Sequence, residues 1–584
     1  MATKSRLIIV SRIALLASLL SLSGGAQEES EVQAQEAFFE KIAVDIVNVE
    51  VYVTDKQGQP VGGLTRDDFS MTEDGKPVEL VNFYRVDAGR PSPELATAEA
   101  MPPADDPSGP APQAPIPPTE SLSVELAVPE SQRLHLIVYV DNYNIHPLNR
   151  NRVFGRLRTF LRDTLQRGDE AMVASYDRSL HIRQPFTGSP DVVNGVLLEL
   201  EKVSGSAVER ESERAAAIQE IFESDVLIKA QLRAKEFANN QYHEVNQALD
   251  ALREMLDSLA GLPGRKMLLH LSDGIPMVPG QDLYQAIQQR FADISALGEA
   301  FGRDMSLRYS ELIAQANSSR ISFYTIDAGG LRTRSGFGAE NAATNTMQPS
   351  SYMAVDGVRA SNLQGTLRMM ANRTGGRAIL NTNDVTAGLA RVASDFGNYY
   401  SLGYRAPVTE RGRYHKIEVR LAKENKDWSL RHRDGYRDKS ISARINDGAR
   451  AFLVHGYETN PLGVSIEVGR QSLADDEMTA VPIRVRIPMS KIVLLPRSDH
   501  FEGRLKLYFS AVAESGRDAP LQELPLDLRI PRSSIEFARK DDVVRVIDAT
   551  MRPGPHKLVV AVRDEIGEER SVVGRHLTVA GATP

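Results

Sequence analysis

The sequence predicts a multidomain protein with a central α/β doubly wound (Rossmann-like) domain, an N-terminal β unit and a C-terminal immunoglobulin-like β-sandwich. The central prediction rests on three nearly continuous apolar segments, residues 133–141, 266–273 and 320–327, each of which ends in an aspartate. Such runs are typical of parallel strands that are covered on both faces. Helical spacing of apolar residues between these segments indicates the alternation of strand and helix that builds a parallel sheet.

Length, charge and composition exclude several classes of protein. A chain of 584 residues is too long for one hydrophobic core, since domains usually contain about 100–200 residues. The formal net charge of -8 and the lack of a basic tract argue against nucleic acid or acidic lipid as the main partner. The sequence contains no cysteine, which excludes disulfides, thiolate metal sites and a cysteine nucleophile.

The first 26 residues have the composition of a secretory signal peptide. A basic start is followed by an apolar run at 13–22 and by small residues at 24–26. The run is shorter than the roughly 20 residues that span a bilayer, and no later segment is long enough to do so. We therefore expect cleavage near Ala26, export to the periplasm or the extracellular space, and no integral membrane segment.

Residues 37–88 are predicted to form a small N-terminal β unit. Valine alternates with polar residues at 47–53, as in a half-buried strand, and a turn at 73–75 precedes a second strand. Residues 89–130 are rich in proline, alanine and acidic residues, so we expect a disordered linker there.

The α/β domain is assigned to residues 131–398. The expected helices span residues 153–165, 208–259 (one or two helices), 283–317 and 363–373. The alternating charges at 209–214 are interpreted as a solvent-exposed helix face. The segment 328–361, rich in glycine and asparagine, is predicted to be a loop near the carboxyl ends of the strands, either ordered for binding or disordered.

Two β-rich segments follow the α/β domain. Residues 399–439 alternate as strands and either extend that domain or join the N-terminal β unit, and Trp428 is expected to pack there. Residues 440–584 contain several alternating strands separated by glycine, proline and aspartate turns. This spacing is typical of an immunoglobulin-like β-sandwich, although such a fold does not indicate a function.

Three short motifs carry a resemblance to a known family. They are Asp141 after the first strand, Ser272-Asp273-Gly274 after the second, and Gly375-Gly376 before a last short strand. With them, residues 133–398 resemble a von Willebrand factor type A domain. The segments 44–86, 399–404 and 434–436 resemble more specifically the secreted von Willebrand factor A-related proteins of acidobacteria, a family that implies no established biochemical activity.

The resemblance implies a metal-ion-dependent adhesion site at the carboxyl ends of the strands. In such a site an Asp-x-Ser-x-Ser turn, a threonine and a final aspartate hold Mg²⁺, and a carboxylate of the partner completes the coordination. Asp141 and Asp273 match the two aspartates and are the candidate metal ligands. Tyr143 and Ile145 occupy the serine positions and His243 the threonine position, so three oxygen ligands are missing. We therefore expect a degenerate site without a cofactor, with Mg²⁺ binding as the alternative.

The candidate partner-binding face consists of six residues. These are Asp141, Asn142, Tyr143, Asn144, His243 and Asp273. His243 is expected to cap the two carboxylates, and a transition-metal site made with them is the alternative.

The predicted function is that of a secreted, non-catalytic, adhesion-type protein that binds a protein partner. The sequence contains no Gly-x-Ser-x-Gly or His-Glu-x-x-His motif, so an enzyme is not expected. The alternatives are adhesion through an atypical ion site and a secreted hydrolase that uses Asp141 and Asp273.

Overall fold

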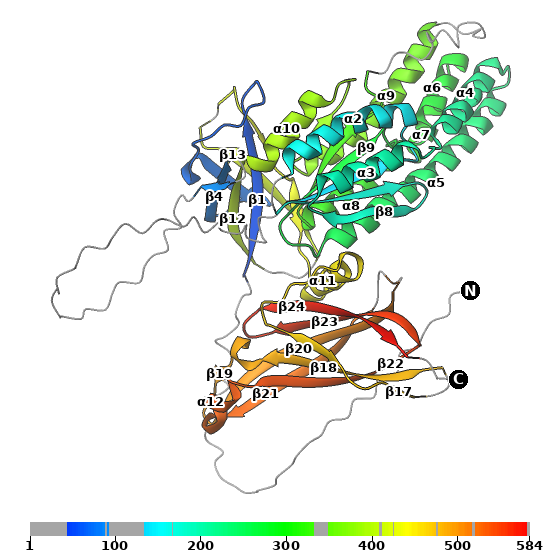
Figure 1. The fold of residues 1–584 in the computed structure, drawn as a ribbon. Coiled ribbons are helices and arrows are strands. Elements are labelled where there is room, and N and C mark those ends of the chain that lie inside the picture. The colour runs from blue at the N-terminus through cyan, green and yellow to red at the C-terminus, as the bar shows by residue number, and fades with distance from the viewer. Residues whose placement is uncertain are drawn as a thin grey trace, which may run out of the picture.

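The computed structural model describes residues 44–87, 90–92, 134–165, 168–331, 349–407, 412–423, 425–474, 477–514, 516 and 520–580. The predicted signal peptide and nearly all of the predicted linker lie outside these residues. The described chain forms an α/β domain, a β domain beside it, and a C-terminal β-sandwich (Figure 1). Within the described ranges, no helix is both long enough and apolar enough to cross a bilayer.

The α/β domain is built on a six-stranded sheet with the order β11-β10-β9-β6-β7-β8. All neighbouring strands are parallel except the edge strand β8, which is antiparallel to β7. The strands are β6 (Leu134–Asp141), β7 (Glu170–Tyr176), β8 (Leu180–Thr187), β9 (Arg265–Ser272), β10 (Ile321–Asp327) and β11 (Ala378–Ile379). Every residue of β6 and β9 is buried, which confirms the predicted central strands.

Helices cover both faces of this sheet. Successive residues of a strand point to opposite faces, so each strand contributes side chains to the cores on both sides. Leu136, Val138 and Val140 of β6 pack in one core cluster, whereas Ile137 and Tyr139 pack in another. The first cluster includes α2 (Pro147–Thr164), α3 (Pro190–Glu201) and α10 (Thr386–Gly397). The second includes α5 (Leu227–Leu259), α8 (Ser306–Ser318) and α9 (Pro349–Arg373). The domain is therefore doubly wound.

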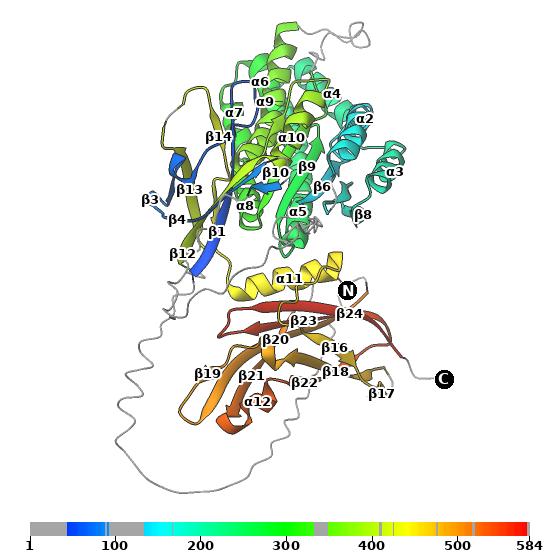
Figure 2. The ribbon, with the colours of Figure 1, turned by 60° about the vertical axis from the view of Figure 1, so that its left-hand side comes forward.

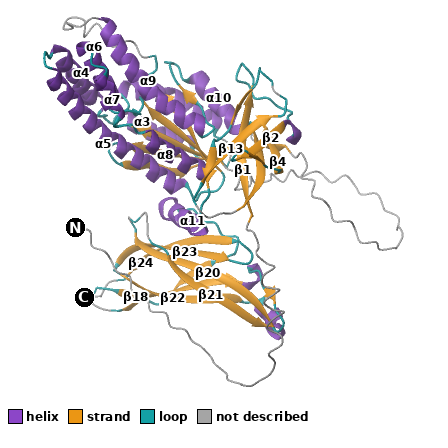
Figure 3. Cartoon of the chain, turned by 180° about the vertical axis from the view of Figure 1, so that it is seen from behind, coloured by secondary structure: helices purple, strands orange, loops and turns teal. Residues whose placement is uncertain are grey.

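A group of helices with its own core lies at one end of the domain. We call it the helical cap: α4 (Ala207–Glu223), the first half of α5, α6 (Gln281–Phe291), α7 (Ser295–Phe301) and the first half of α9. Its core contains Ile218, Ile221, Phe237, Tyr284 and Val355, which do not belong to either sheet cluster. Figures 1 and 3 show the cap at the end of the molecule farthest from the β-sandwich.

Two helix predictions in this region are wrong in extent. The expected helix at 283–317 is three helices, because Ala292 adopts a left-handed conformation with φ of 55° and ends α6. The expected loop at 328–361 is helical from Pro349 onwards, where α9 begins, and residues 332–348 lie outside the described chain. Val355 explains the difference, because it anchors this part of α9 in the core of the cap.

The β domain combines segments from both sides of the α/β domain. Its sheets have the orders β14-β1-β12-β4-β5 and β15-β13-β2-β3 and share one apolar core, against which Trp428 packs. The strands are β1 (Val44–Thr54), β2 (Phe69–Glu73), β3 (Lys76–Pro77), β4 (Leu80–Asp87), β5 (Arg90–Ser92), β12 (Tyr399–Pro407), β13 (Tyr414–Leu421), β14 (Ser429–Arg431) and β15 (Gly435–Arg437). A short 3-10 helix, η1 (Arg66–Asp68), precedes β2. The segment at 399–437 therefore joins the N-terminal β unit, one of the two arrangements that the sequence left open.

Buried charges fix the β domain against the α/β domain. Arg320 pairs with Glu50, and Arg433 donates to the carbonyls of Asn317 and Asn48 at 2.8 and 2.7 Å. Burial raises the pKa of Glu50, but the charges of Arg320 and Arg433 outweigh it and lower the pKa to about 2. This contact lies at the amino ends of β9 and β10, opposite the edge that carries Asp141.

The C-terminal segment begins with a helix, which corrects the prediction of a β-sandwich from residue 440 onwards. α11 (Ile441–His455) packs Ile445, Phe452 and Leu453 against the sheet that contains β23. Figure 2 shows α11 between the α/β domain and the sheets. A Cβ atom at Gly261, just after α5, would collide with the Asp447 carbonyl of α11, so the two backbones are in direct contact.

Two sheets follow α11 and enclose a common core of aliphatic residues and Phe509. The first contains β16, β17, β18 and β22, and the second contains β19, β20, β21, β23 and β24. The strands are β16 (Ser465–Val468), β17 (Ser472–Leu473), β18 (Thr479–Pro488), β19 (Leu495–Pro496), β20 (His500–Ala513), β21 (Gln522–Pro531), β22 (Asp542–Met551), β23 (Gly554–Asp564) and β24 (Arg570–Val579). Short helical turns are η4 (Met489–Lys491), η5 (Arg532–Ser534) and α12 (Ile535–Ala538). Alternate residues of β18 are buried, as the sequence pattern predicted.

Candidate functional site

Asp141 ends β6 and is completely buried. Its Oδ2 atom accepts hydrogen bonds from Ser272 Oγ at 2.7 Å and from Asn144 Nδ2 at 2.9 Å, and its Oδ1 atom accepts from the Asn144 backbone N–H at 3.2 Å. Burial raises the pKa of Asp141 to about 6, although these hydrogen bonds oppose the shift. Both carboxylate oxygens are therefore used to close the turn after β6.

Asp273 follows β9 and is partly buried. Its Oδ2 atom accepts from the His146 backbone N–H at 2.9 Å and from Asn149 Nδ2 at 3.1 Å. Because α2 begins at Pro147, the carboxylate lies at the amino end of this helix, where the unpaired N–H groups and the helix dipole favour negative charge. Asp273 thus fixes the start of α2.

Tyr143 occupies the first serine position of the implied metal site, and its side chain is buried. Its hydroxyl donates to Glu244 Oε1 at 2.7 Å, and the guanidinium groups of Arg178 and Arg210 lie 5.5 and 4.5 Å from the centre of its ring. Burial and the bond to Glu244 raise the pKa of Tyr143 to about 12. Ile145, at the second serine position, is part of the sheet core.

Arg210 of α4 connects the turn after β6 to α5. Its Nη1 atom donates to Asn144 Oδ1 at 2.6 Å, and its Nε atom donates to Glu244 Oε2 at 3.1 Å. Asn144 in turn holds Asp141, so one chain of hydrogen bonds runs from the end of β6 to the helical cap. The guanidinium places a positive charge beside the position where the resemblance implied a metal ion.

Two residues of the predicted binding face point elsewhere. His243 is exposed on α5, and it contacts Tyr242 rather than either aspartate, so the prediction that it caps them is wrong. One residue along a helix turns the side chain by about 100°, and it is Glu244 that faces the turn after β6. Asn142 is buried and donates to the Ser204 carbonyl at 3.1 Å, away from Asp273.

A polar cavity of about 610 Å³ lies between the carboxyl edge of the sheet and the helical cap. Asn144, Asp273 and Glu244 line it from the sheet and α5, and α4, α6 and α9 supply further walls. Three arginines and six carboxylates line the cavity. The carboxyl edge, which the sequence predicted as a partner-binding face, is therefore roofed by helices.

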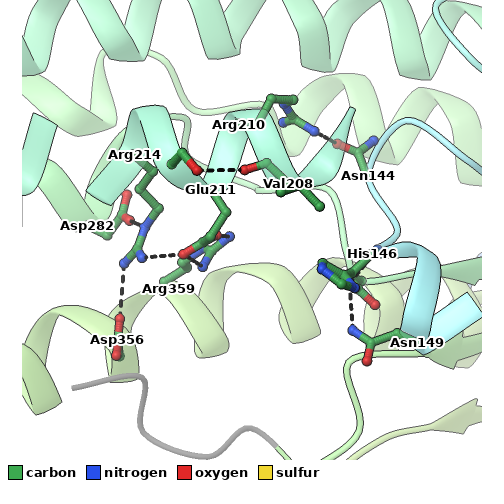
Figure 4. A network of polar contacts seen from close by, with 12 residues as sticks. Asn144, His146, Asn149, Val208, Arg210, Glu211, Arg214, Asp282, Asp356 and Arg359 are labelled. Carbon is green, nitrogen blue, oxygen red and sulfur yellow. Dashed lines mark hydrogen bonds and ion pairs between the residues drawn. The ribbon is translucent and has the colours of Figure 1, made fainter. Parts of the chain in front are cut away.

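An ionic network holds the roof of this cavity together (Figure 4). Arg214 of α4 is buried and pairs with Asp282 of α6, with Asp356 of α9 at 3.1 Å and with Glu211 at 3.1 Å. Arg359 of α9 also pairs with Glu211, at 2.6 Å. The alternating charges at 209–214 thus form a solvent-exposed face only in part, because Glu209 and Glu213 are exposed whereas Arg214 is turned into the cap.

The residues at the carboxyl edge do not fit the implied Mg²⁺ site. Tyr143 directs its hydroxyl to Glu244, Ile145 lies in the core, and His243 faces solvent, so none supplies the missing oxygen ligands. Among the described residues, the one group of three His, Asp or Glu side chains with ligand atoms within 4.8 Å of one another is Glu73, Asp74 and His415, in the β domain.

Sequence reasoning located Asp141, Asn144 and Asp273 correctly at the carboxyl edge, but it missed Arg210, Glu244 and the network around Arg214. The sequence did contain a signal for Glu244, because its neighbour Val245 belongs to the apolar stripe of α5 and Glu244 therefore lies near the buried side of that helix. No local signal pointed to Arg214, whose partners Asp282 and Asp356 are 68 and 142 residues away.

Comparison with known proteins gives weak similarities. No family model matches the chain, and no curated protein matches it in sequence. A von Willebrand factor type A protein from Catenulispora acidiphila is 9% identical, with a TM-score of 0.20 over 77% of this chain and 66% of that one. The manganese-loaded TRAP protein of Plasmodium vivax is 9% identical, with a TM-score of 0.21 over 53% and 94%.

A third solved structure, a mutant of the PilB minor pilin from Streptococcus sanguinis, is 12% identical, with a TM-score of 0.23 over 46% of this chain and 62% of that one. Scores this low carry no argument about function. Our conclusions about this chain therefore rest on its own geometry: a mixed α/β protein with several sheets and a polar, roofed cavity at the carboxyl edge of its parallel sheet.

Proposed function

We propose that this is a secreted, non-catalytic binding protein whose α/β domain holds a protein partner at the cavity beneath the helical cap. The cavity is the observation that carries the proposal. It lies at the carboxyl ends of β6 and β9, where open α/β sheets bind their ligands. The ion pairs of Arg214 connect α4, α6 and α9 before any partner arrives, so binding needs little further ordering of these walls.

The positions of the two aspartates support a non-catalytic role. A general acid or base must reach the proton that it transfers, within about 2.6–3.2 Å. Asp141 is completely buried and binds Ser272 and Asn144, and Asp273 is engaged with the start of α2. The hydrolase alternative would require both carboxylates to leave these partners. Adhesion through a metal ion is supported no better, because the ligand positions are degenerate.

The charges of the cavity indicate the chemistry of the partner. Carboxylates outnumber arginines in the lining by six to three, and Glu213 of α4 is exposed at the rim. A partner segment that carries lysine or arginine side chains complements this lining. The resemblance implied the opposite, an acidic partner group that completes a metal ion.

A matched pair of variants on α4 tests the proposal. Glu213 lines the cavity, whereas Glu209 is exposed on the same helix outside the lining. Immobilised wild-type protein should retain a partner from the exported proteins of the producing cells, identified by mass spectrometry. Glu213→Arg should weaken the retention of that partner by about tenfold or more, because it places a cation against a basic segment. Glu209→Arg, with the same change of charge, should bind as the wild type does.

Two outcomes would contradict the proposal. The first is a partner that both variants retain equally, since binding would then occur elsewhere on the chain. The second is turnover of a substrate that is lost in Asp273→Asn, since the site would then be catalytic.

A further inference from the structure

A second cavity lies at the opposite edge of the same sheet. Its volume is about 430 Å³, and it is lined by residues near the amino ends of β9 and β10, by the end of the β domain, and by α11 and β24. It is therefore formed jointly by the α/β domain, the β domain and the C-terminal unit. Figure 2 shows α11 at this junction.

The lining of this junction cavity is strongly basic. Lysine and arginine side chains outnumber aspartates by seven to two, although the whole chain has a net charge of -8. Both aspartates are already engaged. Asp447 pairs with Lys439 at 2.7 Å, and Asp438 lies 3.6 Å from His415 Nε2. Arg320 pairs with Glu50, which lies outside the lining. The cations that carry the argument are therefore Lys266, Arg433 and Arg437.

Two of the cations are buried, and burial of a charged group is unfavourable in free energy because the group loses its hydration. Lys266 is 3% exposed and donates to the Leu262 carbonyl at 2.6 Å. Burial, reinforced by the charges of Arg320 and Lys439, lowers the pKa of Lys266 to about 7. A buried ammonium group normally has a carboxylate or another anion beside it, whereas here its hydrogen bond goes to a neutral carbonyl.

Arg433 repeats this pattern. It is 8% exposed, and its two terminal nitrogens donate to the carbonyls of Asn317 and Asn48. Within the described part of the chain, its Nε atom has no hydrogen-bond acceptor. Arg437, two residues after Gly435 on the same strand, is exposed at the mouth of the cavity. The buried donors of Lys266 and Arg433 and the exposed cation of Arg437 thus line one cavity.

We propose that the junction cavity binds a phosphate group, with Lys266 and Arg433 at its base and Arg437 at its mouth. A phosphate carries up to two negative charges and accepts several hydrogen bonds, and guanidinium groups match its oxygens in pairs. The source is either a soluble phosphate ester or the headgroup of an anionic phospholipid. This site is independent of the cavity beneath the helical cap, and the two can be tested separately.

The first test measures binding of inorganic pyrophosphate to the full-length protein by titration calorimetry and by the melting temperature, at constant ionic strength set with chloride. Pyrophosphate should bind saturably and raise the melting temperature, whereas chloride alone should not. Arg437→Ala should weaken binding by about tenfold or more, because it removes a charge-assisted hydrogen bond. Arg437 is exposed, so this variant is expected to fold.

Arg529→Ala is the matched control, because Arg529 of β21 is exposed, lies outside the lining and gives the same change of charge. Equal affinities of Arg437→Ala and Arg529→Ala would overturn the proposal, as would a lack of saturable binding at millimolar pyrophosphate. Lys266→Met provides a second, buried probe and should also abolish the gain in melting temperature.

Vesicles distinguish the two sources of phosphate. Sedimentation with phosphatidylglycerol vesicles, but not with phosphatidylcholine vesicles, that is lost in Arg437→Ala would assign the site to a lipid headgroup. Saturable pyrophosphate binding without sedimentation would assign it to a soluble phosphate ester.

Discussion

The buried charged groups at the two edges of the parallel sheet have different kinds of partner. At the carboxyl edge, Asp141 and Asp273 accept hydrogen bonds from serine, asparagine and backbone groups, and the arginines above them pair with carboxylates. At the amino edge, Lys266 and Arg433 donate to carbonyls, and cations outnumber carboxylates. The lining of the first edge thus has an excess of carboxylates, and the lining of the second has an excess of cations. The sign of the excess charge, rather than the number of charged residues, indicates the charge of the partner that each edge suits.

The largest expected effect comes from removing Arg214, the cation that pairs with three carboxylates above the carboxyl edge. Arg214→Met keeps most of the side-chain volume but leaves Asp282 buried without its guanidinium partner. We expect a loss of about 3–5 kcal/mol in the free energy of unfolding, measured by urea denaturation. Arg290→Met, which removes an exposed pair with Asp225, should cost less than about 1 kcal/mol. Equal losses would mean that the network around Arg214 does not hold the cap.

A second prediction concerns the pH dependence of Lys266. Its pKa is about 7 in the folded chain and near its ordinary value of 10.5 in the unfolded chain, so between these values the unfolded state binds one more proton. Raising the pH from about 7 to 10.5 should therefore stabilise the fold, by roughly 2–4 kcal/mol. In Lys266→Met this contribution should disappear, which urea denaturation at several pH values can measure. A variant that retains the full increase would show that Lys266 is charged and compensated without a ligand.

Asp141 should show the opposite dependence at the other edge. Its folded pKa of about 6 lies above the ordinary 3.8, so between these values the folded state binds the extra proton. Stability contributed by Asp141 should therefore fall by about 2 kcal/mol as the pH rises from 4 to 6. Asp141→Asn should remove this fall, and Asp163→Asn on the surface of α2 is the control that should not. Unchanged pH profiles in both variants would contradict the burial of an ionisable carboxyl at this position.

The smallest expected effect is the difference in the free energy of unfolding between variants of His243 and Glu244, two neighbouring residues on α5. His243→Ala should change the free energy of unfolding by less than about 0.5 kcal/mol, because the side chain is exposed. Glu244→Ala should cost about 1–3 kcal/mol, because it removes the acceptor of both Tyr143 and Arg210. Thermal or urea denaturation of the two variants gives the comparison. The reverse order would restore His243 as the residue that faces the turn after β6.

Sequence reasoning succeeded where local pattern determines structure. The apolar runs that became β6 and β9 and the alternation that became β18 need no knowledge of distant residues. It failed at α11, whose apolar residues Ile445, Ala449 and Phe452 lie at helical spacing directly before a long alternating region. At the candidate site it found the aspartates, because strand ends are visible in sequence.

The parts of the site that sequence reasoning missed depend on helix rotation and on contacts between distant segments. His243 and Glu244 are adjacent on α5, and spacing to the motif of a von Willebrand factor type A domain cannot decide which of them faces the turn after β6. Arg214 lies in a segment with the charge pattern of an exposed helix. It is buried because α6 and α9 pack against α4 and supply its partners Asp282 and Asp356. The basic cavity at the junction is not visible in any one segment, because three units contribute to it.

The interleaved β domain has a consequence for the order of folding. Leu64 donates to the Tyr400 hydroxyl across 336 residues, and Arg433 reaches Asn48 across 385. Synthesis runs from the amino end, so β1 lacks its partners β12 and β14 until the whole α/β domain has been made. Until then β2 and β4 can pair only with the short strands β3 and β5. Such long loops close slowly, and unpaired edges invite association with other chains. We expect pulsed hydrogen exchange during refolding to protect the amides of β9 before those of β1, so the assembly of the β domain would be the step at which the chain most needs a chaperone.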